Sequence, residues 1–473
     1  MGWKFVSLAG VVLAAACTTA QAATVTLDAD GMAVINGTRT FLIGLYEIPK
    51  EDALLEEVAE AGFNLVRSRE NVGALDRLHE VGVWAWINTG MKIDFSVNRE
   101  DREALVRKSV DALGEHPALA VWEVPDEALW NTWYRAQTWR EQREPRQLAE
   151  RIDGIEEQSR RDALRGQLRQ SRELREFGEY AKAERIADKL WEQLDEAPPE
   201  PDLNMADAPE RAAKLAEGLY EGYRFIKRLD PVHLVWMNHA PRNQIEQLAA
   251  FNRAADVVGC DIYPVPRSQR VRHSDIADQT VAAVGAYTER MQAAAPDKPV
   301  WMVLQGFGWG DLFEEEEPEV RERLRRPTKQ ETRFMAFDAI VHGARAIFYW
   351  GTTTIEKDVP FWKELLEVVS ELDELQPVLS APEADLPVEA AFAPTFGSVD
   401  RGIVVLAKDA PDGVCLIVVN EWTSPLTYTL EGLDSLDGTV YQDTATERAS
   451  TVEAGALTLP IPAQSVHVLR PQP

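Results

Sequence analysis

The sequence is poor in cysteine and in histidine. Only 3 cysteines and 7 histidines occur among 473 residues, and the histidines are scattered without the spacing of a metal site. Beyond the N-terminal segment the cysteines are Cys260 and Cys415, which lie in apolar segments of two different predicted domains. Such positions favour buried free thiols over a disulfide. We therefore expect no disulfide framework, no metal centre and no organic cofactor.

Positive charge is also scarce. The chain has 50 basic and 78 acidic residues, for a net charge of -28. This balance argues against a nucleic-acid partner, because phosphate binding needs a basic face, and against docking on an anionic membrane. After the N-terminal segment, no stretch is long and apolar enough to be transmembrane. The charge does not select a substrate, and the sequence leaves the oligomeric state open.

The first residues have the pattern of an export signal. Lys4 precedes a short apolar run, Phe5–Ala16, and Ala20-Gln21-Ala22 has the form of a cleavage site. The sequence therefore predicts a signal peptide over residues 1–22 and a periplasmic or extracellular protein. Ala14-Ala15-Ala16-Cys17 resembles a bacterial lipoprotein box, so a lipid anchor at Cys17 is an alternative.

From Phe41 onward, short apolar runs alternate with amphipathic helical stretches, which is typical of βα units around a parallel sheet. Eight such strands predict an α/β protein with a (β/α)8 TIM barrel, over residues 23–380. A doubly wound open sheet is the alternative, but no glycine-rich phosphate loop follows the first strand. The predicted strands are Phe41–Tyr46, Asn64–Ser68, Val83–Asn88, Ala118–Val124, Leu234–Asn238, Val257–Tyr263, Val300–Gln305 and Ala346–Trp350.

Two regions fall outside this alternation. The connection between the fourth and fifth strands is far longer than a barrel helix requires, and it is rich in Glu, Arg, Gln, Ala and Leu. It predicts a helical insertion over residues 130–205, a hairpin rising from the catalytic face. A structural or oligomeric role is favoured for it over a lid or substrate wall. Short strands after residue 385 predict a small C-terminal antiparallel β-sandwich domain, residues 385–473.

In a TIM barrel the reacting groups stand at the carboxyl ends of the strands. The residues there are polar or aromatic, and such a rim suits a carbohydrate, whose hydroxyls form hydrogen bonds and whose rings stack. The candidates are Glu47, Arg67, Asn88, Asp126, Glu127, His239, Asp261, Tyr263, Gln305, Trp309 and Trp350.

The fourth strand carries a specific resemblance. The segment Trp122-Glu123-Val124-Pro125-Asp126-Glu127-Ala128 resembles the Trp-Glu-x-x-Asn-Glu-Pro segment of clan A glycoside hydrolases. That clan comprises (β/α)8 barrels such as cellulases, mannanases and β-galactosidases. The resemblance implies a glycosidase that cleaves an oligo- or polysaccharide, with Glu127 as general acid/base. It also implies that Arg67 lies beside the nucleophile and that Trp350 forms the floor of the sugar-binding site.

Two positions depart from the clan's pattern. Asp126 replaces the Asn that binds the sugar 2-hydroxyl, and Gln305 or Gly306 falls where the nucleophilic Glu is expected. A glutamine can bind a hydroxyl but cannot form a glycosyl ester, so another group must complete the usual carboxyl pair.

Three alternatives follow. Glu47 or Asp261 supplies the second carboxyl group, as nucleophile or as the base of an inverting reaction. In the second alternative, Asp126 and Glu127 act as in the substrate-assisted N-acetylhexosaminidases, which they resemble. In the third, the barrel binds carbohydrate without cleaving it. The residues expected to contact the sugar in each case are Arg67, Asn88, His239, Tyr263, Gln305, Trp309 and Trp350.

Overall fold

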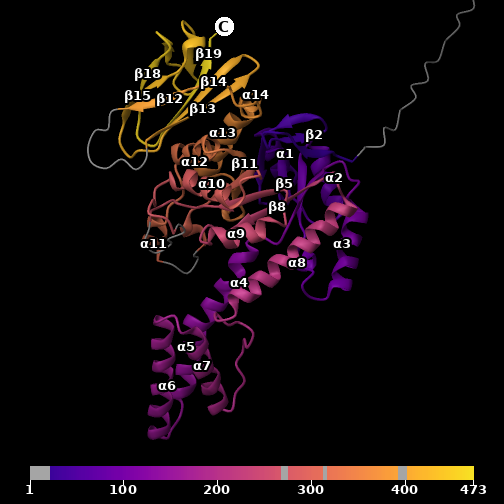
Figure 1. The fold of residues 1–473 in the computed structure, drawn as a ribbon, viewed down its shortest axis with the longest axis vertical. Helices are drawn as coiled ribbons and strands as arrows, with labels where there is room; N and C mark the ends of the chain where they lie inside the picture. The colour runs from indigo at the N-terminus through magenta and orange to yellow at the C-terminus, as the bar shows by residue number, and fades with distance from the viewer. Residues whose placement is uncertain (1–21, 268–274, 313–316, 393–401, 473) are drawn as a thin grey trace, which may run out of the picture.

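The computed structural model describes residues 22–267, 275–312, 317–392 and 402–472 (Figure 1). Cys17 and all of the predicted signal peptide except Ala22 lie outside these residues. The described chain forms a barrel, a helical arm and a C-terminal β-domain. No helix in the described ranges is long and apolar enough to cross a membrane.

Eight parallel strands close into a barrel in the order β10-β11-β4-β5-β6-β7-β8-β9. This confirms the predicted (β/α)8 fold. Most strand residues are buried, as expected for strands covered by helices outside and by packed side chains inside. The strands are β4 (Leu42–Leu45), β5 (Leu65–Arg67), β6 (Trp84–Asn88), β7 (Leu119–Glu123), β8 (Leu234–His239), β9 (Val257–Asp261), β10 (Val300–Gln305) and β11 (Ala344–Trp350).

Amphipathic helices cover the barrel. Gly62 and Gly82 follow the first two, with φ of 105° and 75°, which is the left-handed conformation that ends a helix most readily at glycine. The covering helices are α1 (Asp52–Glu60), α2 (Val72–Glu80), α3 (Arg99–Leu113), α8 (Ala208–Leu229), α9 (Ile245–Asn252), α10 (Ala283–Ala294), α12 (Lys329–Val341) and α13 (Pro360–Glu374), with the shorter α11 (Pro318–Arg323) and α14 (Gln376–Leu379).

Large aromatic side chains fill the barrel's interior. The rings of Trp236 and Trp86 have centroids 5.8 Å apart, and Phe348 lies 4.6 Å from Trp236. Gly44 makes room for this layer, since a Cβ there would lie 1.5 Å from Phe348 Cδ1. Trp301 packs on the same layer, 5.9 Å from Trp236. The barrel is therefore a packed core, with its polar residues above this layer.

The predicted insertion forms an arm that projects beyond the barrel (Figure 1). Helix α4 (Ala128–Gln137) leaves the end of β7 and packs against α8, which returns to the barrel. Between them run a π-helical turn (Thr138–Arg143), α5 (Glu144–Asp153), α6 (Gln158–Glu176) and α7 (Tyr180–Gln193). The arm thus has three helices where a two-helix hairpin was expected. It has its own core around Trp139, Leu148 and Trp191.

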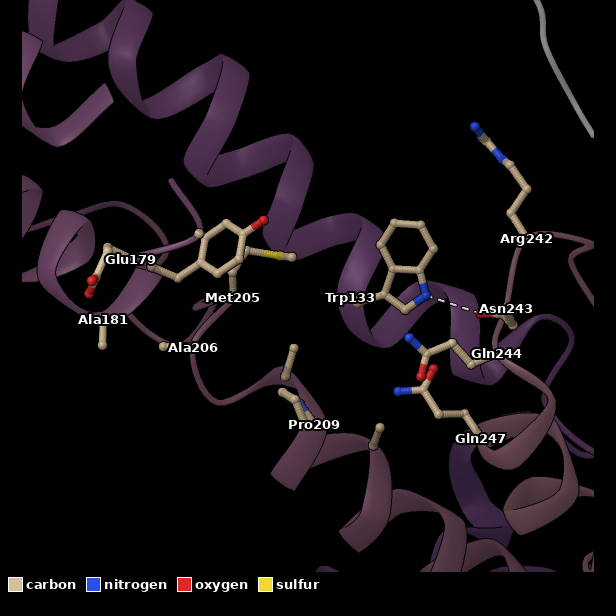
Figure 2. A pocket seen from close by; sticks show the side chains of 14 residues that line it. Trp133, Glu179, Ala181, Met205, Ala206, Pro209, Arg242, Asn243, Gln244 and Gln247 are labelled. Carbon is tan, nitrogen blue, oxygen red and sulfur yellow. Dashed lines mark hydrogen bonds between the residues drawn. The ribbon is translucent and has the colours of Figure 1, made fainter. Parts of the chain in front are cut away.

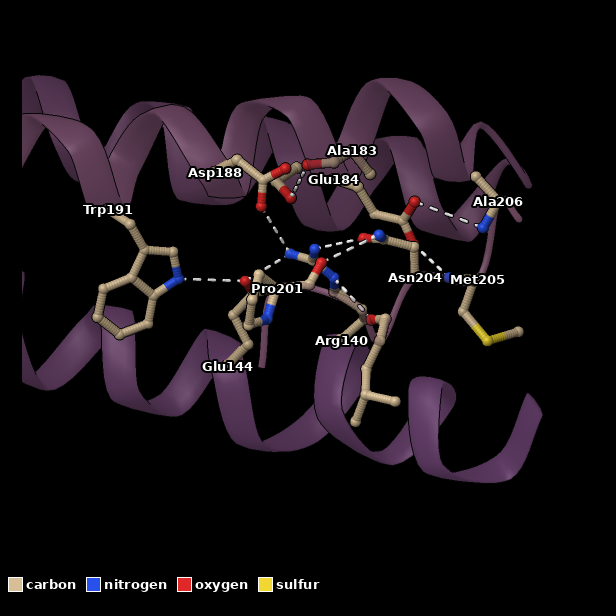
Figure 3. Close-up of polar contacts among 12 residues, drawn as sticks. Arg140, Glu144, Ala183, Glu184, Asp188, Trp191, Pro201, Asn204, Met205 and Ala206 are labelled. Atoms are coloured by element: carbon tan, nitrogen blue, oxygen red, sulfur yellow. Dashed lines mark hydrogen bonds and ion pairs between the residues drawn. The ribbon is translucent and has the colours of Figure 1, made fainter. Parts of the chain in front are cut away.

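A buried charge network stabilises the arm (Figure 3). The Arg140 guanidinium is 1% exposed and donates to Glu144 Oε1 at 2.6 Å and to Asp188 Oδ1 at 3.0 Å. The indole of Trp191 also donates to Glu144, at 3.1 Å, and Arg175 forms a second ion pair with this carboxylate. Each buried charge of the network therefore has an opposite partner within the arm.

The C-terminal domain consists of two antiparallel sheets, ordered β12-β15-β18 and β13-β14-β19-β16-β17. Side chains such as Val418, Tyr428 and Leu459 form a core between them. The domain packs on α12 of the barrel, where Arg333 donates to the Val466 carbonyl. Its strands are β12 (Glu389–Phe392), β13 (Ile403–Ala410), β14 (Gly413–Asn420), β15 (Leu426–Glu431), β16 (Val440–Asp443), β17 (Ala449–Thr451), β18 (Leu457–Ile461) and β19 (Ser465–Pro471).

A small N-terminal sheet covers the amino end of the barrel. It comprises β1 (Val25–Leu27), β2 (Ala33–Ile35) and β3 (Thr38–Thr40). The Val25 amide donates to the carbonyl of Val232, just before β8 begins. This sheet therefore lies at the end opposite the rim where the candidate residues stand.

Candidate active site

Strand alternation decides which side chains enter the rim. Successive residues of a strand face opposite sides, so residues two positions beyond the interior aromatic layer also face inward. Asn88 follows Trp86 in this way, and Asn238 follows Trp236. Their neighbours, including His239, belong to the opposite face. The inward set at the rim includes Tyr46, Arg67, Asn88, Glu123, Asn238, Asp261 and Trp350.

Four acidic side chains gather at the ends of β7 and β9: Glu123, Asp126, Glu127 and Asp261. We call this group the carboxyl cluster. Glu123 is fully buried and accepts from the Trp86 indole at 3.1 Å. Asp126 accepts from the Asn238 amide at 2.9 Å. The carboxyl groups of Glu127 and Asp261 share a hydrogen bond, which requires a proton on one of them.

Burial and mutual repulsion raise the pKa values of the cluster. Burial, and then the charge of Asp126, raise the pKa of Glu127 to about 7. The same two causes raise the pKa of Glu123 to about 8. Burial and the nearby Glu127 raise the pKa of Asp261 well above its usual range. Arg67 opposes the rise at Glu123 and Asp126. The cluster can therefore hold a transferable proton near neutral pH.

The backbone of Glu127 has an unusual conformation, with φ of 50° and ψ of 33°. This left-handed conformation costs a non-glycine residue roughly 1–3 kcal/mol and occurs preferentially at functional sites. It stands where the chain turns from β7 into α4. The Glu127 amide donates to the Asn238 carbonyl at 3.2 Å, which ties the turn to β8. The turn thus holds the Glu127 side chain beside Asp261.

An aromatic wall adjoins the cluster. Tyr263, which hydrogen-bonds Asp261, stacks on Trp350 with a centroid distance of 5.4 Å and an angle of 18°. The Trp309 indole donates to the Tyr263 carbonyl at 3.2 Å, and Phe307 packs edge-on against all three rings. The structure therefore brings together Tyr263, Trp309 and Trp350, three residues expected to contact a sugar.

Arg67 and Asn88 also lie at the cluster. The guanidinium of Arg67 stands over the Tyr46 ring, 5.7 Å from its centroid, and its charge acts on Glu123 and Asp126. The Asn88 side chain hydrogen-bonds Glu123 and also accepts from the Gly90 amide, at 2.7 Å. Both residues therefore support the buried carboxyl groups directly.

Gln305 has a different environment from the one expected for a sugar ligand. Its Oε1 accepts from the Val265 amide at 2.9 Å, and its Nε2 donates to the carbonyls of Val265 and Phe307 at 2.6 Å and 3.0 Å. The side chain is fully buried. Its amide therefore holds the loop after β9 against the end of β10, a structural role that the sequence did not indicate.

Glu47 and His239 also differ from expectation: Glu47 lies in a bend after β4, and His239 lies on the opposite face of β8. Glu47 accepts from the Lys357 ammonium at 2.6 Å, so its charge is already paired. His239 Nε2 contacts Asn252 Oδ1 of α9 at 2.8 Å, and burial lowers its pKa to about 4. Of the two carboxylates considered as partners for Glu127, the structure brings Asp261 to it and pairs Glu47 elsewhere.

Three residues that the sequence reasoning left out belong to this site: Tyr46, Glu123 and Asn238. The Tyr46 hydroxyl is buried and has no hydrogen-bond partner among the described residues, and its pKa is raised well above the usual range by burial and by Asp126. Strict strand alternation could have identified all three, because each faces the interior of the barrel whereas the residue next to it does not.

One group among the described residues could place three metal-ligating atoms together, at the junction of α12 with the C-terminal domain. It comprises Asp338, His342 and Glu421. His342 Nε2 contacts Glu421 at 3.0 Å and Nδ1 contacts Glu289 at 2.9 Å. Because both ring nitrogens of His342 already contact carboxylates, the group links the barrel to the C-terminal domain through ion pairs.

Comparison with known proteins supports the fold. No protein-family model matches the chain, and no curated protein matches it. Among solved structures, it is similar to a glycoside hydrolase (TM-score 0.51, 14% identity, 94% of this chain and 96% of that one). It is also similar to a glycoside hydrolase family 5 protein from Bacteroides vulgatus (TM-score 0.52, 13% identity, 94% and 92%).

A third similar structure is a catalytic mutant of a family 42 β-galactosidase from G. stearothermophilus (TM-score 0.51, 11% identity, 95% of this chain and 100% of that one). At these identities the likeness establishes the fold alone. The chain therefore shares the (β/α)8 fold of these glycoside hydrolases, which is the fold that the resemblance at the fourth strand implied.

Proposed function

We propose that this protein is a glycoside hydrolase in which Glu127 and Asp261 form the reacting pair. The observation that carries the proposal is their direct hydrogen bond within a buried cluster, with the pKa of Glu127 raised to about 7. Groups that share a proton near neutral pH can supply both the acid and the base or nucleophile of the reaction. The fold shared with proteins named glycoside hydrolases supports the same conclusion.

In the proposed reaction, Glu127 donates its proton to the leaving glycosidic oxygen. This step uses the form in which the proton shared by the pair is on Glu127, so that Asp261 is ionised although its pKa is raised. Asp261 then attacks the anomeric carbon as the leaving bond breaks, forming a glycosyl ester. Glu127, now a carboxylate, then removes a proton from water, which hydrolyses the ester and restores both groups. The contact between the two carboxyl groups favours this retaining route, which uses a separation of about 5–5.5 Å, over the wider inverting geometry of about 6.5–9.5 Å.

The remaining rim residues position the sugar in this proposal. Trp350 and Trp309 offer ring faces for stacking, and Arg67, Asn88 and Tyr263 offer polar contacts. A substrate-assisted mechanism would require Asp126 to orient a 2-acetamido group. In the structure the Asn238 amide already engages Asp126, which favours a supporting role for it.

The test is hydrolysis of a panel of aryl glycosides, with and without 2-acetamido groups, by the wild type and by Glu127→Gln. We expect a loss of kcat/KM of about 10²–10⁴-fold in the variant on at least one sugar. Exposed Glu141 on the arm supplies the matched control, Glu141→Gln, which should leave kcat/KM unchanged. Equal activity of wild type and Glu127→Gln on every hydrolysed sugar would contradict the proposal, as would no hydrolysis of aryl or oligosaccharide substrates at all.

A second experiment assigns the two roles. With a dinitrophenyl glycoside, whose leaving group needs no protonation, azide added to Glu127→Ala should give a glycosyl azide of retained configuration. If Glu127 is instead the nucleophile, azide takes its place and the product has inverted configuration. Proton NMR of the product distinguishes the outcomes.

We also propose that the protein is exported. The support is the N-terminal pattern of Lys4, the apolar run and Ala20-Gln21-Ala22. N-terminal sequencing of the mature protein should begin at Ala23. A mature chain that begins with a lipid-modified Cys17 would instead establish the anchored form, and a cytoplasmic chain with Met1 retained would contradict export.

A further inference from the structure

A pocket of about 580 Å³ lies where the arm meets the barrel (Figure 2). We call it the insertion pocket. Several segments line it: α4 through Trp133, the α6–α7 turn through Glu179, the segment before α8 through Met205, the start of α8 through Pro209, and the start of α9 through Gln244 and Gln247. Its size is within the range of small-ligand sites.

The lining has the chemistry of a neutral, hydroxyl-rich ligand. Figure 2 shows Gln244 and Gln247 side by side, both pointing to the space beside Trp133. Neither side-chain amide forms a hydrogen bond to another described residue, whereas the Trp133 indole donates to Asn243 at 3.1 Å. Two amides offer both donors and acceptors, and an indole offers an apolar face, which is the combination a sugar ring uses.

The charged side chains of the pocket also favour a neutral ligand. Arg242 and Glu179 are its ionisable side chains among the lining residues, so the lining has no net charge that would select an anion or a cation. The Arg242 guanidinium stacks on Trp130, 4.8 Å from its ring centroid, and its Nε is buried without a hydrogen-bond partner in the described chain.

The pocket and the active site share two parts of the chain, helix α4 and the segment after β8. Trp133 is six residues beyond Glu127 on one helical stretch, a rise of about 9 Å. The loop carrying Gln244 follows β8, whose Asn238 holds Asp126. A chain of sugar units that is cleaved at Glu127 and leaves the rim along α4 would therefore reach the pocket.

From these observations we propose that the insertion pocket binds the distal units of a neutral oligosaccharide substrate. The identity of the ligand as substrate rests on the proposed function, whereas the binding of a neutral saccharide does not. The arm would then be a substrate wall, which is the role that the sequence reasoning placed second.

The first test is calorimetric binding of cellohexaose, mannohexaose and β-1,4-galactohexaose to the Glu127→Gln protein, with and without the double change Gln244→Ala/Gln247→Ala. We expect at least one hexasaccharide to bind, and the double variant to bind it about tenfold more weakly. The matched control is Gln167→Ala/Gln193→Ala, because these two exposed arm glutamines bond each other outside the pocket. Their removal should leave the affinity unchanged.

Absence of binding for all three hexasaccharides, or equal affinities in the two double variants, would overturn the inference. A changed oligomeric state of Gln244→Ala/Gln247→Ala in sedimentation would overturn it too, since the pocket would then hold a second copy of the chain.

The second test uses the active enzyme. Gln244→Ala/Gln247→Ala should raise KM about tenfold for the hexasaccharide that binds and leave kcat/KM for its aryl glycoside unchanged. An equal change on both substrates would show a general disturbance and contradict the inference. If Glu127→Gln fails to reduce hydrolysis while the pocket variant still weakens binding, the proposed mechanism falls and the binding site stands.

Discussion

The arm and the rim both bury charged side chains, but they treat them in opposite ways. In the arm, buried Glu144 faces two arginines and a tryptophan indole, with the Arg140 contact at 2.6 Å. At the rim, Arg67 acts on two of the four clustered carboxyl groups, and burial together with neighbouring acidic groups raises the pKa values of Glu123, Glu127 and Asp261. A buried charge with an opposite partner costs little to keep, whereas crowded like charges are costly and are typical of sites that transfer protons.

Replacing an acidic side chain by its amide should therefore lower activity but not stability at the rim, and should lower stability in the arm. The largest expected effect is at the rim. Asp261→Asn should lower kcat/KM on a hydrolysed aryl glycoside by about 10²–10⁴-fold. Its melting temperature should equal or exceed the wild-type value, because the amide removes a buried ionisable group. Calorimetry and initial rates measure both. Retained activity would exclude Asp261 from the reaction.

In the arm, Glu144→Gln should destabilise the fold by about 3–5 kcal/mol, because Arg140 and Arg175 both lose the buried carboxylate that they share. Urea unfolding and limited proteolysis within the arm measure the loss. The control is Glu141→Gln on the preceding turn, since Glu141 is exposed and should cost less than about 0.5 kcal/mol. Equal stability of Glu144→Gln and Glu141→Gln would show that the buried ion pairs of Glu144 do not stabilise the arm.

The pH dependence of the reaction sharpens the comparison further. If Glu127 is the acid, kcat/KM should fall about tenfold per pH unit above pH 7, because its pKa is about 7 and its proton is lost there. Dinitrophenyl glycosides, which need no proton donor, should show no such alkaline fall in their first step. An identical fall for both kinds of leaving group would assign the titration to another residue.

The smallest expected effect is on how the stability of the fold changes with pH. The folded protein holds the Glu123 proton up to about pH 8, whereas the unfolded chain releases it near pH 4.5. The folded state thus binds more protons in this window, so its stability falls as pH rises from about 4.5 to 8. Glu123→Gln removes this contribution, and the drop in melting temperature between pH 5 and pH 8 should shrink by about 2–4 °C per kcal/mol removed. An unchanged drop would show that Glu123 is ionised when folded.

Much of the fold could be predicted because it depends on short-range patterns. The alternation of apolar runs with amphipathic helices predicts a (β/α)8 barrel, and the Glu- and Arg-rich composition predicts the helical insertion. The prediction of a two-helix hairpin was wrong in number, since α5 begins after a π-helical turn, Thr138–Arg143. Local sequence propensities do not predict this π-helical turn. The turn contains Arg140 and brings it to its buried partners.

The candidate site was only partly predictable. The motif around Glu127 could be recognised along one strand, and Asp261 was one of two carboxylates considered as its partner. The other, Glu47, has its charge paired by Lys357, a residue 310 positions away, and sequence separation of that size carries no local signal. Strand alternation would have placed His239 outside the rim and Asn238 inside it.

The sequence by itself determined the kind of barrel, the place of the insertion and the candidate acid, because period, composition and a short motif are properties of contiguous residues. Only the tertiary structure decided that Asp261 meets Glu127, that the Gln305 amide is occupied by backbone groups, and that a pocket opens beneath the arm. These depend on strand ends that meet only when the barrel closes, and on the burial that closure imposes on their charges.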